Sequence, residues 1–131
     1  MYRLIAALLI TALSNSASAQ SSFGLICSDQ NEPVPRLLKI RPSEISYFSY
    51  TVNGWGKFHI STVDADQISG NLYMQSGITI NRLDGTWGSY TDINFKTDIN
   101  LQSGVCIRKA IEEMDGIASN YLSMLNSNRA F

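Results

Sequence analysis

Apolar and polar residues alternate in short runs along most of this chain, and turn-forming residues separate the runs. In the run from Lys57 to Val63, Phe58 and Ile60 share one face while polar residues occupy the other. Alternation with a period of two is the pattern of a β-strand that buries one face. Asn53-Gly54 favours a tight reversal because both residues tolerate a positive φ, and Asp84-Gly85 predicts another. The chain therefore predicts a mainly β fold of antiparallel strands.

The number of these runs sets the size of the expected sheet. We expect about seven strands in an antiparallel meander, closed as a barrel or a sandwich. Ile93 to Leu101 continues the alternation and adds either one half-buried strand or a pair of short ones. From about Arg108, apolar residues recur every three or four positions, which predicts one C-terminal α-helix over about 108–125. Its apolar stripe is expected to pack on the sheet, with partner binding as the alternative.

The first nineteen residues have the composition of a secretory signal peptide. Arg3 precedes an apolar run from Leu4 to Leu13, and Ala17-Ser18-Ala19 forms a small-residue cleavage site before Gln20. Cleavage there leaves residues 20–131 as a single β-rich domain. The apolar run is about half of the roughly 20 residues that a membrane-spanning helix needs, so we expect no stable membrane insertion. The sequence predicts a periplasmic or secreted protein.

The chain has two cysteines, Cys27 and Cys106, and both lie after the predicted cleavage site. In an oxidising compartment two cysteines without a third competitor pair with each other. Closing a loop of about 80 residues stabilises the fold by roughly 4 kcal/mol at most. A reactive thiol and a lipid-modified Cys27 are the weaker alternatives, and Leu25-Ile26 precedes Cys27 where a lipid-modified cysteine would follow small residues. The bridge is expected to tie the first strand to the start of the helix.

The net charge of the chain bears on whether it binds nucleic acid. The chain carries 10 Lys and Arg against 11 Asp and Glu, for a net charge of −1, and loss of Arg3 with the leader makes it slightly more acidic. A nucleic-acid-binding protein ordinarily shows a basic excess or a basic stripe. We therefore expect no nucleic-acid partner.

Side chains with catalytic or metal-binding chemistry are few. His59 is the single histidine, and we expect it to face solvent from a strand. One histidine with two bridged cysteines does not supply the three or four ligands of a zinc site. Asp64 and Asp66 could bind calcium weakly in a turn, but the other ligands of an EF-hand loop are missing. The sequence predicts no catalytic residue, no metal and no cofactor, and hence a protein that is not an enzyme.

Two sets of residues leave other functions open. Paired carboxylates could hydrolyse a glycoside, and four acidic residues lie near predicted strand ends, although their spacing selects no pair: Glu44, Asp64, Asp84 and Asp92. Trp55 and Trp87 are candidate binding residues, because flat rings offer contact area at little entropic cost. The alternative is that both tryptophans belong to the core.

The run from Ile78 to Trp87, followed by Gly104-Val105-Cys106, resembles a pattern in small exported bacterial proteins of unknown function. Those proteins have an early strand cysteine, here Cys27, a hairpin similar to I-N-R-x-T-G, and a late G-x-C. Asp84 stands where Thr is common in that hairpin. The resemblance implies a disulfide-closed β fold and no particular activity.

A second resemblance is to the bacterial periplasmic inhibitors of C-type lysozyme, which are small disulfide-closed β-barrels with an S-G-x-x-Y loop. Ser69-Gly70-Asn71-Leu72-Tyr73 matches those five positions. The resemblance implies that Ser69 and Tyr73 help to block a lysozyme cleft. The lysine-containing second motif of that family has no clear counterpart here.

Together these observations predict a non-catalytic binding protein of the bacterial envelope or extracellular space. Its partner would be an unidentified protein or a cell-envelope ligand. A lysozyme-inhibitor-like protein and a carboxylate-dependent hydrolase are the alternatives.

Overall fold

The computed structural model describes residues 22–72, 76–93 and 96–127, and of residues 91–93 and 96–102 it describes the backbone. In these residues nine strands pair into one antiparallel sheet, in the order β4-β3-β2-β1-β9-β8-β7-β6-β5. The strands are β1 (Phe23–Cys27), β2 (Arg36–Arg41), β3 (Glu44–Ser49), β4 (Gly54–Lys57), β5 (Ile60–Val63), β6 (Gln67–Asn71), β7 (Ser76–Asn81), β8 (Thr86–Ile93) and β9 (Lys96–Lys109).

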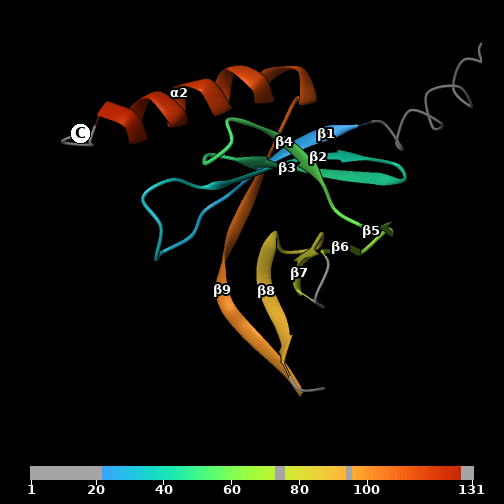
Figure 1. Cartoon of the computed structure of the whole chain (residues 1–131). Helices are drawn as coiled ribbons and strands as arrows, with labels where there is room; N and C mark the ends of the chain where they lie inside the picture. The colour runs from blue at the N-terminus through green and yellow to red at the C-terminus, as the bar shows by residue number, and fades with distance from the viewer. Residues whose placement is uncertain (1–21, 73–75, 94–95, 128–131) are drawn as a thin grey trace, which may run out of the picture.

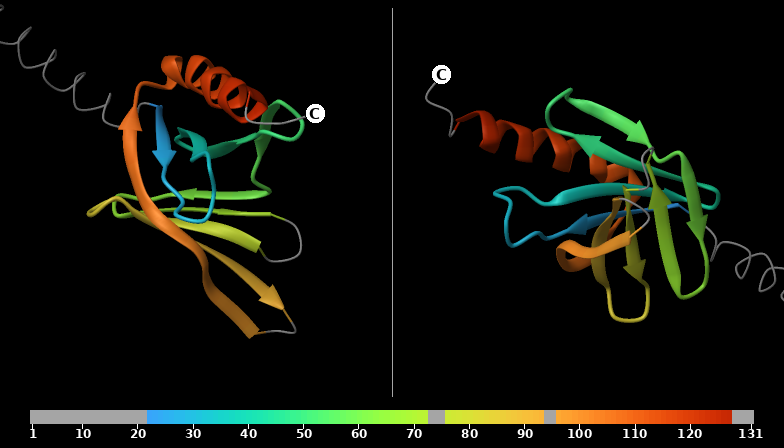
Figure 2. Two further views of the ribbon diagram at one scale, coloured as in Figure 1. Left: turned by 90° about the vertical axis from the view of Figure 1, so that its left-hand side faces the viewer. Right: turned by 60° about the horizontal axis from the view of Figure 1, so that its bottom comes forward.

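The sheet curves into a half-barrel, and β8 and β9 extend from it as a long hairpin, away from the C-terminal helix (Figures 1 and 2). Strands that follow each other in the chain pair with each other, with one added pairing and one exception. β1 and β9 lie side by side, so the first and last strands meet within the sheet. β4 and β5 follow each other in the chain but form the two edges of the sheet. The predicted antiparallel meander is confirmed, and its shape is a half-barrel.

The expected number of about seven strands is wrong, because two of the predicted runs are each divided between two strands. The run Lys57 to Val63 breaks at a corner: the Phe58 N–H donates to the Ile45 carbonyl of β3 at 3.1 Å, and the His59 N–H donates to the Asn71 carbonyl of β6 at 2.8 Å. Consecutive residues thus bond to strands on opposite sides of the half-barrel. The break also shifts the alternation of inward and outward side chains by one residue. Ile60 is therefore 55% exposed and does not share the inward face of Phe58.

The second divided run is the late alternating one, which supplies the end of β8 and the start of β9. Thr91 pairs with Asp98 and Ile93 with Lys96 across this hairpin. From the sequence, this stretch was expected to form either one strand or two short ones. The structure divides it between two strands.

The strands β1 and β2 are buried on both faces, and this divides the core in two. Leu38 and Ile40 point into the half-barrel, where they join Ile45, Ile68, Ile78 and Ile80. Leu37 points the other way and packs with Met114 and Ala118 of the helix α2 (Met114–Ser127). The consecutive residues Leu37 and Leu38 are both almost fully buried because a helix covers one face of β2 and the half-barrel encloses the other.

The helix begins later than the residue spacing suggests. Ile107 and Lys109 still pair with Ile26 and Gly24 of β1, so the chain is extended where the helix was expected to start near Arg108. A 3-10 turn (Ile111–Glu113) leads into α2, which lies across the outer face of β1 to β4 (Figures 1 and 2). Within the described residues, no helix has the length and apolar character needed to span a membrane.

The predicted disulfide between Cys27 and Cys106 is confirmed. The two residues are direct register partners on β1 and β9, with their Cα atoms 3.9 Å apart, and both are buried. The bond therefore joins two neighbouring strands instead of tying β1 to the start of the helix, since Cys106 lies within β9.

Candidate ligand-binding cavity

A cavity of about 540 Å³ lies inside the half-barrel, between β2–β3 on one side and β7–β8 on the other. Its wall is mostly aliphatic and aromatic, and its main apolar residues are Leu38, Tyr47, Phe58, Leu72 and Ile78. Its polar lining includes Glu32, Arg36, Ser76, Ser89 and Tyr90. We refer to this space as the central cavity.

Two glycines position the aromatic wall of the central cavity. The Tyr47 and Phe58 rings meet edge to face with their centroids 5.0 Å apart. A Cβ atom at Gly56 would lie 2.8 Å from the Tyr47 ring, and one at Gly70 would lie 2.6 Å from the Phe58 ring. The rings therefore lie directly against the backbone of β4 and β6, which a larger residue at either position would prevent.

Two tyrosine hydroxyls at this cavity are hydrogen-bond donors in the folded protein. Tyr50 donates to the Pro35 carbonyl at 2.7 Å, and burial together with the nearby Tyr121 raises its pKa to about 12. Tyr90 donates to the Asn71 side-chain oxygen, and burial raises its pKa. Both hydroxyls thus stay protonated well above neutral pH.

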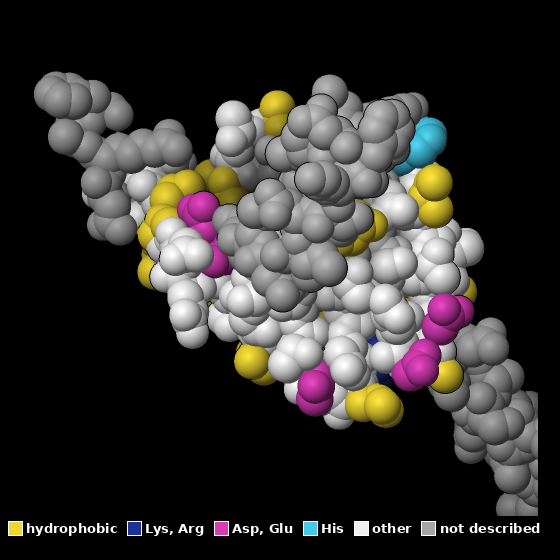
Figure 3. Space-filling view, turned by 90° about the horizontal axis from the view of Figure 1, so that it is seen from below, with side chains coloured by type: hydrophobic (Ala, Val, Ile, Leu, Met, Phe, Trp, Pro, Cys, Tyr) yellow, Lys and Arg dark blue, Asp and Glu magenta, His cyan; other side chains and the backbone are white. Residues whose placement is uncertain are grey.

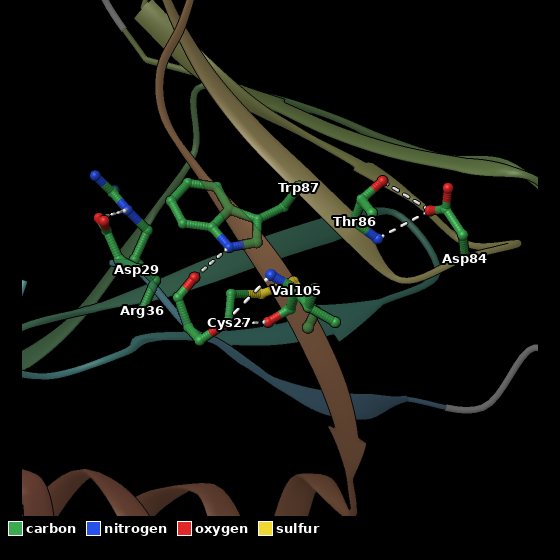
Figure 4. The surroundings of a disulfide bond; sticks show 9 residues. Cys27, Asp29, Arg36, Asp84, Thr86, Trp87 and Val105 are labelled. Carbon is green, nitrogen blue, oxygen red and sulfur yellow. Dashed lines mark hydrogen bonds and ion pairs between the residues drawn. A yellow bond between two sulfur atoms is a disulfide. The ribbon is translucent and has the colours of Figure 1, made fainter. Parts of the chain in front are cut away.

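Arg36 brings a charge to the rim of the central cavity. Its guanidinium lies 5.1 Å from the centroid of the Trp87 ring, and its Nε atom is 3.9 Å from a carboxylate oxygen of Asp29 (Figure 4). Asp29 also accepts a hydrogen bond from the Asn31 N–H at 3.0 Å, which holds the loop after β1 in place. Because Asp29 is buried beside Arg36, the pair brings little net charge to the rim.

Trp87 is one of the two predicted binding tryptophans, and its side chain is inside the fold. It is 3% exposed, and its indole N–H donates to the Ser28 carbonyl at 2.8 Å, next to the disulfide (Figure 4). The Ser28 N–H in turn donates to the Val105 carbonyl at 2.9 Å. The ring therefore joins β8 to the segment that follows Cys27.

Trp55, the other predicted binding tryptophan, fastens the helix to the sheet. Its indole N–H donates to the Asp115 carboxylate at 2.8 Å, and the Lys39 ammonium lies 4.4 Å from its ring centroid. Lys39 also pairs with Asp115 at 2.7 Å, and this bond is the main reason that the pKa of Asp115 is lowered. An edge-to-face contact with Phe48 covers another side of the ring. The structure thus places the two tryptophans apart from each other and outside the apolar wall of the central cavity.

Ser69 lies on β6 with its side chain on the face opposite to Ile68, which points into the core. It lines a polar groove of about 800 Å³ on the outside of the sheet, beside its register partner Thr79 and near Gln67 and Asn81. Tyr73, its predicted companion, lies outside the described residues.

The acidic residues considered for hydrolysis lie at separate places, and Figure 3 shows acidic side chains scattered along the margin of one face. Glu44 pairs with Arg41 and Lys57. Asp84 accepts hydrogen bonds from the Thr86 hydroxyl and N–H, which lower its pKa. The side chain of Asp92 lies outside the described part. Of the side chains that the structure describes, Glu32 is the one carboxylate that lines the central cavity.

The other titratable candidates lie at turns. His59 is exposed at the corner between β4 and β5, and Asp64 and Asp66 are exposed in the turn between β5 and β6. Over residues 22–72, 76–93 and 96–127, no group of three or more His, Cys, Asp or Glu side chains is arranged to hold a metal ion.

Sequence reasoning missed the central cavity because its residues come from the loop before β2, from β2, β3, β7 and β8, and from segments between strands. Alternation indicates which face of a single strand is buried, but the pairing of distant strands decides which of these faces enclose a space. No sequence pattern marked Arg36 as a residue of a binding cavity, since it directly follows a proline-rich loop. Comparison of the chain with protein-family models, curated protein sequences and solved structures finds no match.

Proposed function

We propose that this protein is a non-catalytic binding protein that holds a small, largely apolar ligand in the central cavity. The observation that supports this proposal is the cavity itself, about 540 Å³ in volume and walled by aliphatic and aromatic side chains. Small-molecule sites are typically concave, apolar and about 300–1,000 Å³ in volume, with a few polar groups that orient the ligand.

The polar groups of the cavity suit an uncharged or weakly polar ligand. Tyr50 and Tyr90 keep their hydroxyl protons. The charged side chains in the described lining, Glu32 and Arg36, have opposite signs, and Arg36 also has the buried Asp29 beside it. A ligand with one hydroxyl group on an apolar body could donate to a tyrosine oxygen, since each phenol oxygen still accepts while its own proton is bonded elsewhere, and it would meet an apolar wall within. A strongly charged ligand would lose hydration without a dedicated counter-charge.

We place this activity in the periplasm or outside the cell. The leader sequence from Met1 to Ala19 supports export, and the buried Cys27–Cys106 bond is of the kind that persists in oxidising compartments. Both observations agree with a ligand from the cell envelope or its surroundings.

A cavity-filling substitution tests the proposal. The probe is N-phenyl-1-naphthylamine, an uncharged apolar dye whose fluorescence rises when it leaves water. Leu72→Trp places a larger side chain in the cavity, and we expect the dye to bind about ten-fold more weakly or not at all. The matched control is Leu83→Trp, because Leu83 is 82% exposed and lies outside the cavity lining.

Urea unfolding of both variants checks that the folds are equally stable. Equal dye affinity for the wild type and Leu72→Trp, with both proteins folded, would refute the proposal. Dye binding that is lost equally in Leu83→Trp would place the dye on the surface and would refute it as well.

Lysozyme inhibition is a second candidate, supported by the position of Ser69 in the outer groove. On this proposal the purified protein slows hydrolysis of cell walls by a C-type lysozyme. Ser69→Arg would abolish the inhibition, whereas Ser43→Arg, in the exposed turn between β2 and β3, would not. Unchanged lysozyme turnover at micromolar concentrations of the wild-type protein would remove this candidate.

A further inference from the structure

Two arginines meet at one aromatic ring at the other end of the half-barrel core. The Arg108 guanidinium lies 4.4 Å from the centroid of the Phe23 ring, and that of Arg82 lies 5.5 Å from it. Arg108 comes from β9, where it is the register partner of Leu25, and Arg82 comes from the turn that follows β7. The fold thus brings two cationic groups from distant parts of the chain to one place.

Neither guanidinium has an acidic partner among the side chains that the structure describes. The ion pairs there join other residues, and no carboxylate oxygen of a described side chain is within 4.0 Å of Arg82 or Arg108. The neighbouring acidic turn contacts Arg82 through its backbone: Nη1 donates to the Asp64 carbonyl at 2.7 Å, and the Arg82 N–H donates to the Asp66 carbonyl at 2.9 Å. These bonds orient Arg82 without neutralising it.

Most of the hydrogen-bonding capacity of the two groups remains available. A guanidinium has five N–H donors, and the fixed contacts above use one of those on Arg82. Such groups bind carboxylates with paired hydrogen bonds, and cation–π contact with a ring holds them in position. The arrangement therefore offers a preorganised set of donors for an anion.

Both arginines line a cavity of about 200 Å³ that is separate from the central cavity. Its apolar wall comes from Phe23, Leu25, Ile68 and Ile80. The volume corresponds to about seven water molecules at roughly 30 Å³ each, which is enough for a short alkyl chain but not for a long lipid. Positive charge at an apolar space is complementary to a molecule that has an anionic head and a small apolar tail.

We propose that Arg82 and Arg108 form a second binding site, which takes a small amphipathic carboxylate such as a medium-chain fatty acid. The carboxylate lies between the two guanidinium groups, and the alkyl chain enters the apolar space beside Phe23. This site is independent of the ligand that we propose for the central cavity.

Octanoate is the probe, and isothermal titration with the purified protein is the measurement. We expect octanoate to bind at least ten-fold more tightly than octanol, which lacks the charge, and than acetate or inorganic phosphate, which lack the tail. Equal binding of octanol would show that the arginines contribute nothing, and equal binding of phosphate would show a plain anion site. Either result overturns the proposal, as does the absence of octanoate binding.

Substitutions of the two arginines test whether octanoate binds between them. Arg108→Gln and Arg82→Gln are each expected to weaken octanoate binding about ten-fold or more, and Arg108→Lys is expected to weaken it less, because it keeps the charge but not the paired donors. The matched control is Lys109→Gln, which removes the next charge along β9 without touching the cavity. An equal loss in Lys109→Gln would indicate a general charge effect and overturn the proposal.

The central-cavity variant separates the two sites. Leu72→Trp is expected to leave octanoate affinity unchanged, and Arg108→Gln is expected to leave the affinity for N-phenyl-1-naphthylamine unchanged. Octanoate binding that is lost in Leu72→Trp but kept in Arg108→Gln would place the fatty acid in the central cavity and refute this inference. Urea unfolding midpoints of all variants confirm that each protein is folded.

Discussion

Gly104 lies where β9 passes the segment that follows β1, and the space there admits no side chain. A Cβ atom at this position would lie 1.9 Å from the Ser28 carbonyl oxygen and 2.8 Å from the Trp87 indole nitrogen. The first of these neighbours is backbone, held by the hydrogen bonds between Ser28 and Val105, so it cannot rotate away. Close approach of two backbones is a usual reason for glycine inside a strand.

Gly104→Ala is therefore expected to lower the free energy of unfolding by about 3 kcal/mol, the upper part of the range for overpacked sites. Gly116→Ala is the matched control, because Gly116 is in α2 and nothing lies within 4 Å of its added Cβ atom. In a helix that change stabilises by about 0.5–1 kcal/mol. Urea denaturation followed by tryptophan fluorescence measures both, and equal effects of the two substitutions would contradict this account.

At the scale of elements, α2 is held to the sheet by an apolar contact and by a polar one. Met114 is 0% exposed and its side chain lies over Gly24 of β1, where an added Cβ atom would be 2.2 Å from the sulfur. Asp115, the next residue, binds Lys39 of β2 and Trp55 of β4. The two contacts use adjacent residues, so they fix both the position of the first helical turn and its rotation about the helix axis.

Met114→Ala is expected to destabilise the protein by about 2–5 kcal/mol, because it leaves a cavity between α2 and β1. Met124→Ala, in the same helix but 53% exposed, is expected to change the stability by less than about 0.5 kcal/mol. Far-ultraviolet circular dichroism and tryptophan fluorescence, recorded through the same urea titration, are the measurements. Similar losses for both methionines would show that α2 is not packed as described.

The Asp115 contact predicts a pH dependence of helix docking. Its folded-state pKa is lowered below the ordinary 3.8, first by the Lys39 hydrogen bond, so its contribution to stability is present above pH 3.8 and is lost as the pH falls through the lower folded value. Because Asp115 is largely exposed, that contribution is below about 1 kcal/mol. Asp115→Asn should be less stable than the wild type at neutral pH and equally stable at acidic pH. A difference that persists in acid would assign the effect to something other than this charge.

Some features of the fold could be predicted from the local residue pattern. The others depend on which distant strands pair, and no local pattern encodes that pairing. The local pattern placed the reversals at Asn53-Gly54 and Asp84-Gly85, where Asn53 and Gly85 adopt a positive φ. It failed at Phe58, where two consecutive residues bond to different strands, and at Ile107, whose spacing fits the helix although it pairs with β1. The proposed Arg82–Arg108 site was equally invisible, because it joins the turn after β7 to β9, which β8 separates from β7 in the sheet.

For the molecule as a whole, the sheet order places β1 and β9 together in its interior. The segments on either side of this pair fold as two sets of strands. The set β2 to β4 carries the helix on its outer face, and in the set β5 to β8 the strands β7 and β8 form the opposite wall of the central cavity. The Cys27–Cys106 bond lies at the junction of these two sets and joins residues 79 apart in the sequence. Its position makes it a covalent link between the two walls of the half-barrel.

Replacing both cysteines by alanine is therefore expected to lower the free energy of unfolding by about 2–4 kcal/mol, chiefly because the unfolded chain regains the freedom of a long loop. Urea denaturation of the double variant, compared with the wild type before and after reduction, measures this effect. The reduced wild type should unfold near the double variant, because both lack the same link. Wild type isolated from its own compartment and denatured without reductant should take up no thiol-reactive label. Labelling of both cysteines, or an unfolding midpoint that reduction leaves unchanged, would show that the native protein does not depend on this bond.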